Sequence, residues 1–444
     1  MTARNLAPSE RYATLFRDAL PALPGARDPR VREFREASFE RFQRLGFPGP
    51  KSEAWKYTSV GPIVRRAFGL AAAAGLERAA IAPYVIPDPG ATRLVFVNGR
   101  FAAELSDEVS DRAGLHVATL AAALENGVDD LLTLLPERDL ERGFSALNGA
   151  FASDGCVVRL SPGAVPRGPL QLLFVTVGEA APELISPRNL FVLGDGARLD
   201  LIESHVALGT GEALVNLVER FVIGKGAELR HDRLQVGEAS GSLLGKIEYE
   251  ISADARLTQT VATLGGALVR NEIEALIGGS GIAAQLNGLY LTRERQHIDN
   301  YIRVDHARPN STSDQFFKGV LDGRAQAVFA GRIMVRRDAQ KTNAYQANNN
   351  LLLSPDAEID TKPELEIFAD DVKCSHGATA GELDERELFY LRSRGLDPAT
   401  ARSLLTYAFA GEVLERFTNR SIALQARREV LRWLPGGASL EELA

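Results

Sequence analysis

The sequence predicts a mainly β protein built around a parallel β-helix, with a mostly helical region before it and a helical region after it. From Cys156 to about Gly377, short β-rich runs are separated by Gly, Asp and Ser, with almost no helical periodicity. Within this stretch a tight turn followed by an alanine recurs, and a repeat near thirty residues indicates stacked supersecondary units. The repeated alanines are residues 197, 227, 255, 284, 325 and 357.

The intervals between these alanines favour a coil of strands over a repeated βα unit. Each interval contains two or three runs of strand length and no convincing helix, as expected for strands that stack on neighbouring coils. Inward positions of successive coils lie about 4.8 Å apart, so a small residue beside each turn permits close approach. Glycine supplies the positive φ at the corner. A β-sandwich with coincidentally spaced turns is the alternative fold.

The first predicted region, residues 1–143, is mostly helical with a few strands. Residues 27–49 have apolar side chains at helical spacing and end in Gly-Phe-Pro-Gly, which predicts an amphipathic helix. Residues 92–105 predict a hairpin that turns at Asn98-Gly99. The β-helix core is predicted over residues 144–382, because helical periodicity gives way to strand-like runs after that boundary.

The last predicted region, residues 383–444, is helical again. A short helix over 383–396 closes at Arg394-Gly395, and the next begins with Asp397 as its N-cap and Pro398 in its first turn. This second helix has a broad apolar side. Packing against the solenoid is one explanation, because solenoids need capped ends, and binding of a partner is the other.

Composition and charge exclude several classes of function. A formal net charge of −7 without a basic block argues against a nucleic-acid binder. No apolar run approaches the roughly 20 residues that a membrane span requires. The N-terminus lacks a signal-peptide core, so we expect a cytoplasmic protein. Two cysteines in 444 residues do not form a disulfide framework, so free thiols are expected.

Common catalytic motifs are missing from the sequence. There is no GxxxxGK[ST] loop, so the chain is not expected to bind or hydrolyse a nucleotide by itself. Neither GxSxG nor HExxH occurs, and we predict a protein that is not an enzyme. The polar segment 340–354 is interpreted as an amide and hydroxyl ladder that lines one face of the solenoid.

The segment "VKCSHGAT" contains the one candidate metal site. Residues two apart on a strand point to the same side, so Cys374 and His376 face one environment together. Thiolate and imidazole are good ligands for iron, zinc or copper, but two ligands do not complete a site. Other ligands must then come from elsewhere, such as a second chain. Alternatively, Cys374 is a buried small hydrophobe and His376 a satisfied turn residue.

The other histidines and the second cysteine lack a comparable partner and are expected to be structural or surface residues. They are His205, His231, His297, His306 and Cys156.

Several segments together resemble the SufD branch of the SufB/SufD family, scaffolds of the SUF iron–sulfur cluster assembly system. The resemblance covers nearly the whole chain. It includes "SEAWKYTSV", "FSALNGAFASDG", "HIDNYIRVDHARPNSTSDQFFKGVLDGRAQAVFAGRI", "QKTNAYQANNNLLLS", "ADDVKCSHGAT" and "LFYLRSRGL".

The resemblance implies a right-handed parallel β-helix with helical regions at both ends. It implies a heterodimer with SufB, paired through the β-helix, and two copies of the ATPase SufC docked on the C-terminal helical regions. SufB would supply the missing metal ligands and SufC the missing nucleotide site. The resemblance leaves open whether a flavin binds the complex and whether the chain dimerises by itself.

The resemblance also assigns residues. His376 would lie opposite a SufB cysteine and help to hold iron or a transient iron–sulfur cluster, with Cys374 beside it. SufC docking maps onto the segment from Leu388 to Phe417. The docking residues are Leu388, Phe389, Tyr390, Arg392, Gly395, Leu404, Leu405, Tyr407 and Phe409.

Two alternatives come from other classes. A β-helix carbohydrate-active enzyme would carry a groove lined by carboxylates, whereas the repeated phrase here features Ala and Gly. A stand-alone homodimer would bind metal through Cys374 and His376 of each chain. Only the scaffold hypothesis requires a stable complex with SufB and SufC.

Overall fold

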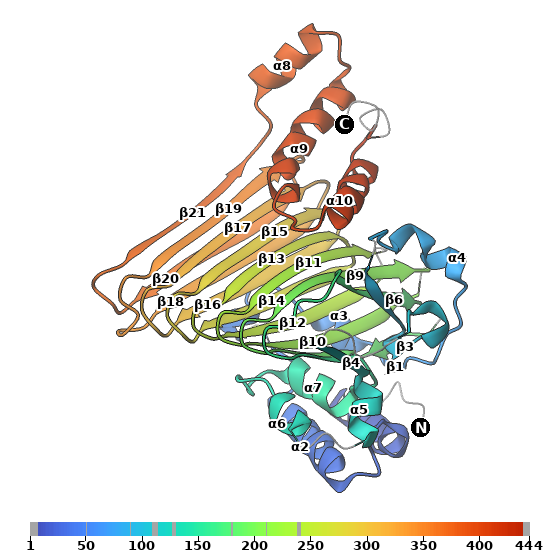
Figure 1. The fold of residues 1–444 in the computed structure, drawn as a ribbon. Coiled ribbons are helices and arrows are strands. Elements are labelled where there is room, and N and C mark those ends of the chain that lie inside the picture. The colour runs from blue at the N-terminus through green and yellow to red at the C-terminus, as the bar shows by residue number, and fades with distance from the viewer. Residues whose placement is uncertain are drawn as a thin grey trace.

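Two stacked parallel sheets form a flattened solenoid with helices on its outer faces (Figure 1). The computed structural model describes residues 8–49, 51–88, 90–108, 114–126, 130–178, 181–209, 211–237 and 241–437. Along the solenoid the chain alternates between the sheets, so one contains the even-numbered strands β8 to β20 and the other the odd-numbered strands β9 to β21. The prediction of a mainly β fold with a parallel solenoid core is confirmed.

The elements have the following bounds. The helices are α1 (Pro8–Ala19), α2 (Pro29–Leu45), α3 (Gly61–Arg65), α4 (Arg78–Ile81), α5 (Leu120–Asn126), α6 (Leu131–Leu134), α7 (Gly143–Phe151), α8 (Glu385–Ser393), α9 (Pro398–Leu414) and α10 (Arg420–Trp433). The first strands are β1 (Gly69–Leu70), β2 (Thr92–Val97), β3 (Arg100–Phe101), β4 (Leu115–Thr119), β5 (Cys156–Leu160), β6 (Leu170–Val177), β7 (Glu183–Ile185) and β8 (Arg188–Leu193). The remaining strands are β9 (Arg198–Leu208), β10 (Ala213–Ile223), β11 (Glu228–Gly237), β12 (Ser242–Ile251), β13 (Arg256–Gly265), β14 (Leu268–Ile277), β15 (Ala283–Thr292), β16 (His297–His306), β17 (Thr312–Leu321), β18 (Gln326–Val335), β19 (Asn343–Leu352), β20 (Glu358–Ile367) and β21 (Lys373–Gly381).

The turns that lead into the odd-numbered sheet are stacked on one another. Each contains one residue with a φ between 60° and 75°, a conformation that glycine adopts at little cost. The turn residues are Gly196, Gly226, Asp254, Gly281, Asn310 and Lys341. Neighbouring turns are joined by backbone hydrogen bonds, as between the Gly226 N–H and the Ala253 carbonyl. The repeat therefore has a backbone cause.

The alanine spacing is correct for the early coils and wrong for the later ones. Ala197, Ala227 and Ala255 each follow the positive-φ residue, but the equivalent position in the next coil is Ile282, two residues before the predicted Ala284. The later predicted alanines precede β18 and β20 and so belong to the turns of the other sheet. This switch of sheet explains the long interval before Ala325. The register itself steps by 27 to 31 residues per coil along the odd-numbered sheet.

Three apolar layers hold the molecule together. The largest fills the solenoid between the two sheets, with Phe221, Ile273 and Phe317 fully buried. The N-terminal helices α1, α2 and α7 pack on the outer face of the even-numbered sheet. The C-terminal helices α9 and α10 pack on the outer face of the odd-numbered sheet, where Leu289 of the sheet and Val413 of α9 belong to one apolar cluster. Helices therefore cover both flat faces.

The local predictions for the two flanking regions are confirmed. Asp28 caps α2 by accepting a hydrogen bond from the Arg30 N–H, and the helix ends at Gly46, whose φ is 63°. β2 and β3 form the expected antiparallel hairpin with positive φ at Asn98 and Gly99. Asp397 accepts hydrogen bonds from the first turn of α9, as its N-cap role requires.

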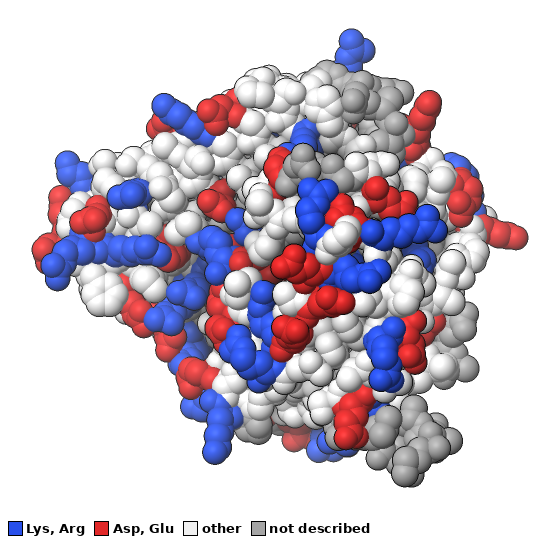
Figure 2. Space-filling model, turned by 90° about the horizontal axis from the view of Figure 1, so that it is seen from below, with Lys and Arg blue, Asp and Glu red and all other residues white. Residues whose placement is uncertain are grey.

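The surface carries charges of both signs. On the face shown in Figure 2, Lys and Arg side chains are interspersed with Asp and Glu, without a continuous basic stripe. Among the described residues, none of the helices combines the length and the apolar character needed to cross a membrane.

Candidate functional site

The solenoid has one uncovered end. Within the described residues, β20 pairs only with β18, and β21 pairs only with β19. The preceding strand β19 alternates buried and accessible positions, whereas neither β20 nor β21 has a single buried residue. The inward side of the last coil is therefore accessible because no further coil lies against it (Figure 1).

Cys374 and His376 lie on the inward side of this last coil. The register places them beside Ala344 and Gln346 of β19, both of which are buried in the interior. Cys374 is half-buried against a small apolar cluster that includes Ala339, and burial raises the pKa of its thiol. His376 is exposed. Among the described residues, no third His, Cys, Asp or Glu completes a metal site with these two.

The two free strand edges differ in their capacity to pair. In β20 the Glu358 N–H points to β18, so alternate residues from Ile359 onward point their backbone groups to the free edge. Pro363 is one of these residues, so this edge lacks a donor at its centre, as is usual for a protected edge strand. β20 also carries acidic and basic side chains along its length. β21 contains no proline, and its one Lys, Arg, Asp or Glu residue is Lys373. The edge of β21 is the better template for another strand.

The C-terminal helices divide into a packed pair and a protruding helix. Helix α8 extends away from the sheets (Figure 1), and its Phe389 and Tyr390 are 72% and 56% exposed. Tyr407 and Phe409 of α9 are partly buried against the odd-numbered sheet, where the Lys318 ammonium lies over the Phe409 ring. Of the two explanations for the apolar side of α9, packing against the solenoid is therefore observed.

The remaining residues of the expected docking segment are spread between these two settings. Arg392 and Gly395 are exposed, Leu388 is buried, and Leu404 and Leu405 are partly exposed.

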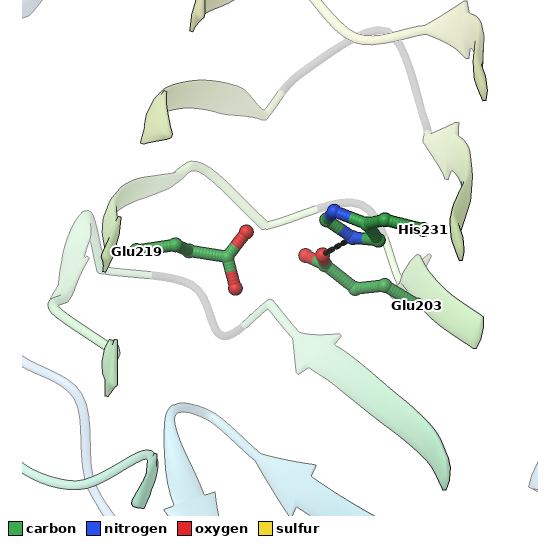
Figure 3. Close-up of side chains that lie close together, drawn as sticks. All are labelled: Glu203, Glu219 and His231. Atoms are coloured by element: carbon green, nitrogen blue, oxygen red, sulfur yellow. Dashed lines mark hydrogen bonds and ion pairs between the residues drawn. The ribbon is translucent and has the colours of Figure 1, made fainter. Parts of the chain in front are cut away.

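A buried polar cluster lies inside the solenoid, far from these surfaces. Glu203 of β9 and His231 of β11 come from one sheet and Glu219 of β10 from the other, and their side chains point toward one another (Figure 3). The Nε2 atom of His231 lies 2.8 Å from Glu203 Oε2, and its Nδ1 atom lies 2.8 Å from the Tyr249 hydroxyl. Glu203 also contacts His205 Nε2.

The two carboxyl groups of the cluster have opposite pKa shifts. Burial raises both pKa values, but the guanidinium of Arg233 and the contacts with His205 and His231 hold the pKa of Glu203 well below its usual range. Burial together with the negative charge of Glu203 raises the pKa of Glu219 well above its usual range. The surroundings therefore favour the ionised form of Glu203 and the protonated form of Glu219.

His205 and His231 are buried, as expected of structural residues, but the expectation that they lack a comparable partner missed their shared contact with Glu203. Glu203-x-His205 has the same two-residue spacing as Cys374-x-His376, so the pattern of an acidic residue and a histidine was visible in the sequence. Only the register, which brings β9, β10 and β11 together, could reveal Glu219 and His231.

The remaining three residues have structural settings, as expected. His297 and His306 bond to the hydroxyls of Thr58 and Ser313, and Cys156 is fully buried.

Comparison with known proteins identifies the family. The domain family described as "SUF system FeS cluster assembly, SufBD core domain" matches residues 174–409, and that described as "SufBD protein N-terminal region" matches residues 6–172. The chain belongs to the SufBD family. The expected family resemblance is thus confirmed, and the chain is a SufD-like protein of iron–sulfur cluster assembly.

Individual relatives cover almost the whole chain. The iron–sulfur cluster assembly protein SufD of Escherichia coli is 31% identical over 403 residues, which cover 90% of this chain and 92% of that protein. An iron–sulfur cluster assembly SufBD family protein of Synechocystis is 31% identical, with 91% of each chain covered. The chloroplastic protein ABCI7 of Arabidopsis thaliana is 29% identical over 95% of this chain and 89% of that protein. These relatives are thus similar to this chain along at least 90% of its length.

Proposed function

We propose that this SufBD family protein is the non-enzymatic scaffold subunit that pairs with SufB through its open solenoid end and docks the ATPase SufC by its C-terminal helices. The open last coil carries the proposal, because it leaves an unpaired parallel strand and an incomplete pair of metal ligands at the same place. A partner strand at this edge would satisfy both at once.

The free edge of β21 is the pairing surface in this proposal. The Lys373 N–H points to β19, so Cys374, His376 and Ala378 point their N–H groups away from the solenoid. A strand that added to this edge would receive these hydrogen bonds and would lie beside the two candidate ligands. Pro363 and the charges of β20 disfavour the same pairing on the other sheet.

A transient iron ion or iron–sulfur cluster would be held between the subunits. His376 supplies an imidazole and Cys374 a thiol, and both suit iron in the presence of further ligands from SufB. The ion and the cluster are cargo in this proposal, and the chain contributes position and ligands. We place this assembly in the cytoplasm.

SufC docking uses the protruding helix α8 and the start of α9. Two adjacent aromatic side chains, Phe389 and Tyr390, are mostly exposed there, and exposed aromatic residues are common anchors of protein interfaces. Tyr407 and Phe409 already pack on the solenoid, so in this arrangement they support the docking helices from below. ATP-driven dimerisation of SufC could then pull on both scaffold arms.

Co-purification with SufB and SufC tests the pairing edge. Ala378→Pro removes one donor from the free edge of β21 while leaving the hydrogen bonds to β19, and we expect it to abolish or strongly weaken SufB binding. Thr361→Pro makes the same change on the free edge of β20 and is expected to bind SufB normally. Equal binding by both variants would refute pairing through β21, and recovery of this chain only with itself would favour the homodimer.

Cluster assembly tests the ligands. His376→Ala should form the complex with SufB and SufC but fail to assemble a cluster in anaerobic reconstitution, followed by absorption spectroscopy. Normal cluster assembly would remove His376 from the site.

SufC binding tests α8. Phe389→Ala with Tyr390→Ala should lose SufC and retain SufB, while Tyr57→Ala, an exposed tyrosine of the N-terminal region, should retain both. Retention of SufC by the α8 variant would refute docking there.

A further inference from the structure

The buried cluster inside the solenoid has the composition of a metal site. Glu203, Glu219 and His231 each offer one ligand atom, and these atoms lie within 4.8 Å of one another. We propose that these three residues bind a divalent first-row transition metal ion in the interior of the solenoid. The proposal is independent of the proposed scaffold function, which uses none of these residues.

The geometry requires only a small adjustment. Such an ion lies about 2.0–2.2 Å from nitrogen and carboxylate oxygen ligands, so two ligand atoms on opposite sides of it are about 4.4 Å apart. The three ligand atoms here lie within 4.8 Å of one another, so a shift of a few tenths of an ångström at most would bring them to this distance. Figure 3 shows the carboxyl group of Glu219 facing the other two side chains across the space between the sheets.

An unsatisfied buried atom points to a missing ligand. The Oε2 atom of Glu219 is fully buried and accepts no hydrogen bond from another side chain, whereas its Oε1 atom accepts a hydrogen bond of 2.7 Å from Asn189. Buried polar atoms in folded proteins nearly always have partners, so either a proton shared with Glu203 or a bound cation must lie beside this oxygen. A cation between Glu219 and Glu203 would satisfy this oxygen.

Neighbouring side chains hold the three ligands in place. The Tyr249 hydroxyl bonds to Nδ1 of His231, which fixes the ring and leaves Nε2 aimed at Glu203. Asn189 holds Glu219 in the same way. Partners of this kind orient the ligands in metalloproteins. The site is thus supported from both sheets.

His205 connects this site to the surface. Its imidazole contacts Glu203 on one side. On the other side it lines a surface hollow of about 40 Å³ together with Thr176 and Gln235. A rotation of the His205 side chain would open a path from this hollow to the cluster and could supply a fourth ligand.

The ligand set selects the class of ion. Two carboxylates with one or two imidazoles suit Zn²⁺, Fe²⁺, Mn²⁺ or Co²⁺, whereas Mg²⁺ and Ca²⁺ prefer oxygen ligands alone. The guanidinium of Arg233, 3.5 Å from Glu203 Oε1, already balances one carboxylate, so the second carboxylate is the one that a metal ion would ionise.

The interior site is separate from the open end. His231 and His376 occupy the same inward row of the odd-numbered sheet, with Gln259, Leu286, Gln315 and Gln346 between them. Five register steps at roughly 4.8 Å each place the two histidines about 24 Å apart. Binding at one site can therefore be measured without the other.

Titration with Co²⁺ tests the proposal. In a Cys374→Ser, His376→Ala background, which removes the ligands of the open end, we expect one equivalent of Co²⁺ to bind with visible d–d absorption. Adding Glu219→Gln should lower the affinity at least tenfold, because loss of a direct ligand costs no less than loss of a supporting residue. Mg²⁺ should not compete.

Glu272→Gln is the matched control. Glu272 is also a buried carboxylate in an ion-pair cluster, with Lys246 and Arg270, and its variant should bind Co²⁺ as the background protein does. Failure of the background protein to bind Co²⁺, or equal affinity of the two variants, would overturn the proposal. If Glu219→Gln does not fold, X-ray absorption of the Zn²⁺-loaded wild type gives the answer: nitrogen and oxygen ligands are expected at the tight site, and a sulfur ligand would contradict it.

Discussion

The interior coils and the last coil are built from the same repeat, but their residues differ in burial. Strands β13 to β17 each lie between two neighbours, and most of their inward residues are fully buried. Strands β20 and β21 follow the same turns and register but have one neighbour each and no buried residue. Burial in a solenoid is thus decided by the neighbouring coil and not by the local sequence, because each coil contacts only the next.

The largest contrast is expected from removal of a phenylalanine ring. Phe317 is fully buried between the sheets against Phe329, so Phe317→Ala should lower the free energy of unfolding by about 3–5 kcal/mol. Phe368 follows β20 and is 61% exposed, so Phe368→Ala should change the unfolding free energy of the isolated chain by less than about 0.5 kcal/mol. Urea unfolding of both variants measures the difference, and similar losses would mean that the last coil is packed in solution.

A pH series sharpens the same contrast. Burial lowers the pKa of His306 to about 4, against about 6.5 for an exposed imidazole, although Asp305 partly opposes the shift. In the unfolded chain this imidazole therefore binds a proton near pH 6.5, whereas in the folded chain it binds a proton only near pH 4. Stability from this residue is complete above pH 6.5 and is lost as the pH falls toward 4, by at most about 3 kcal/mol.

His306→Gln should flatten this acid dependence in urea unfolding between pH 7 and 4.5. His376→Gln, which replaces the exposed imidazole of the last coil, is the control for the general effect of a histidine-to-glutamine change. An unchanged slope in His306→Gln would show that the imidazole of His306 is solvated in the folded chain.

A single added methyl group should also distinguish the two regions. A Cβ atom on Gly288 would overlap the Phe317 ring, so Gly288→Ala should destabilise the chain by about 1–3 kcal/mol through overpacking. A Cβ atom on Gly377 of β21 would meet no atom within 4 Å, so Gly377→Ala should be neutral. Thermal unfolding compares the two variants. An unchanged stability of Gly288→Ala would mean that the two sheets can move apart locally to accommodate the added methyl group.

The smallest effect is expected where the N-terminal region reaches the last coil. Glu53 forms an ion pair with Lys362 of β20, and the Glu53 side chain is well exposed. Exposed pairs of this type contribute little, so Glu53→Ala should leave the unfolding midpoint unchanged within error. A clear decrease would show that this contact holds the last coil in place.

Features that depend on nearby residues were predictable from the sequence. The N-cap Asp397, the Asn98-Gly99 turn and the tight turns of the thirty-residue repeat each arise from a backbone requirement within a few residues. The position of each turn within the repeat was harder to predict. Alanine occurs beside turns of both sheets, and Ile282 takes its place in one coil. The positive-φ residue marks that position better, although Lys341 shows that even this signal is not restricted to glycine.

Features that depend on register were not predictable. Glu203, Glu219 and His231 lie on three strands, and nothing short of the pairing of β9 with β11 brings the first and last together. The amide ladder of segment 340–354 was predicted as a lining, and Gln346 does bond to Gln315 in the interior. Which strand end stays open depends on where the chain leaves the solenoid, so the exposure of Cys374 and His376 required the structure.

The short antiparallel strands β3 and β4 at the opposite end of the solenoid limit how large an assembly can become. They finish the two sheets with strands of two and five residues, reversed in direction relative to the coils. The even-numbered sheet also carries β1 there, a parallel strand of only two residues that pairs with β7. Within the described residues, a long parallel edge that could extend the row therefore exists at one end alone. If two subunits paired through these edges, neither would have a free edge of this kind left. The continuous row of strands would then end at two subunits and would not grow into a fibre.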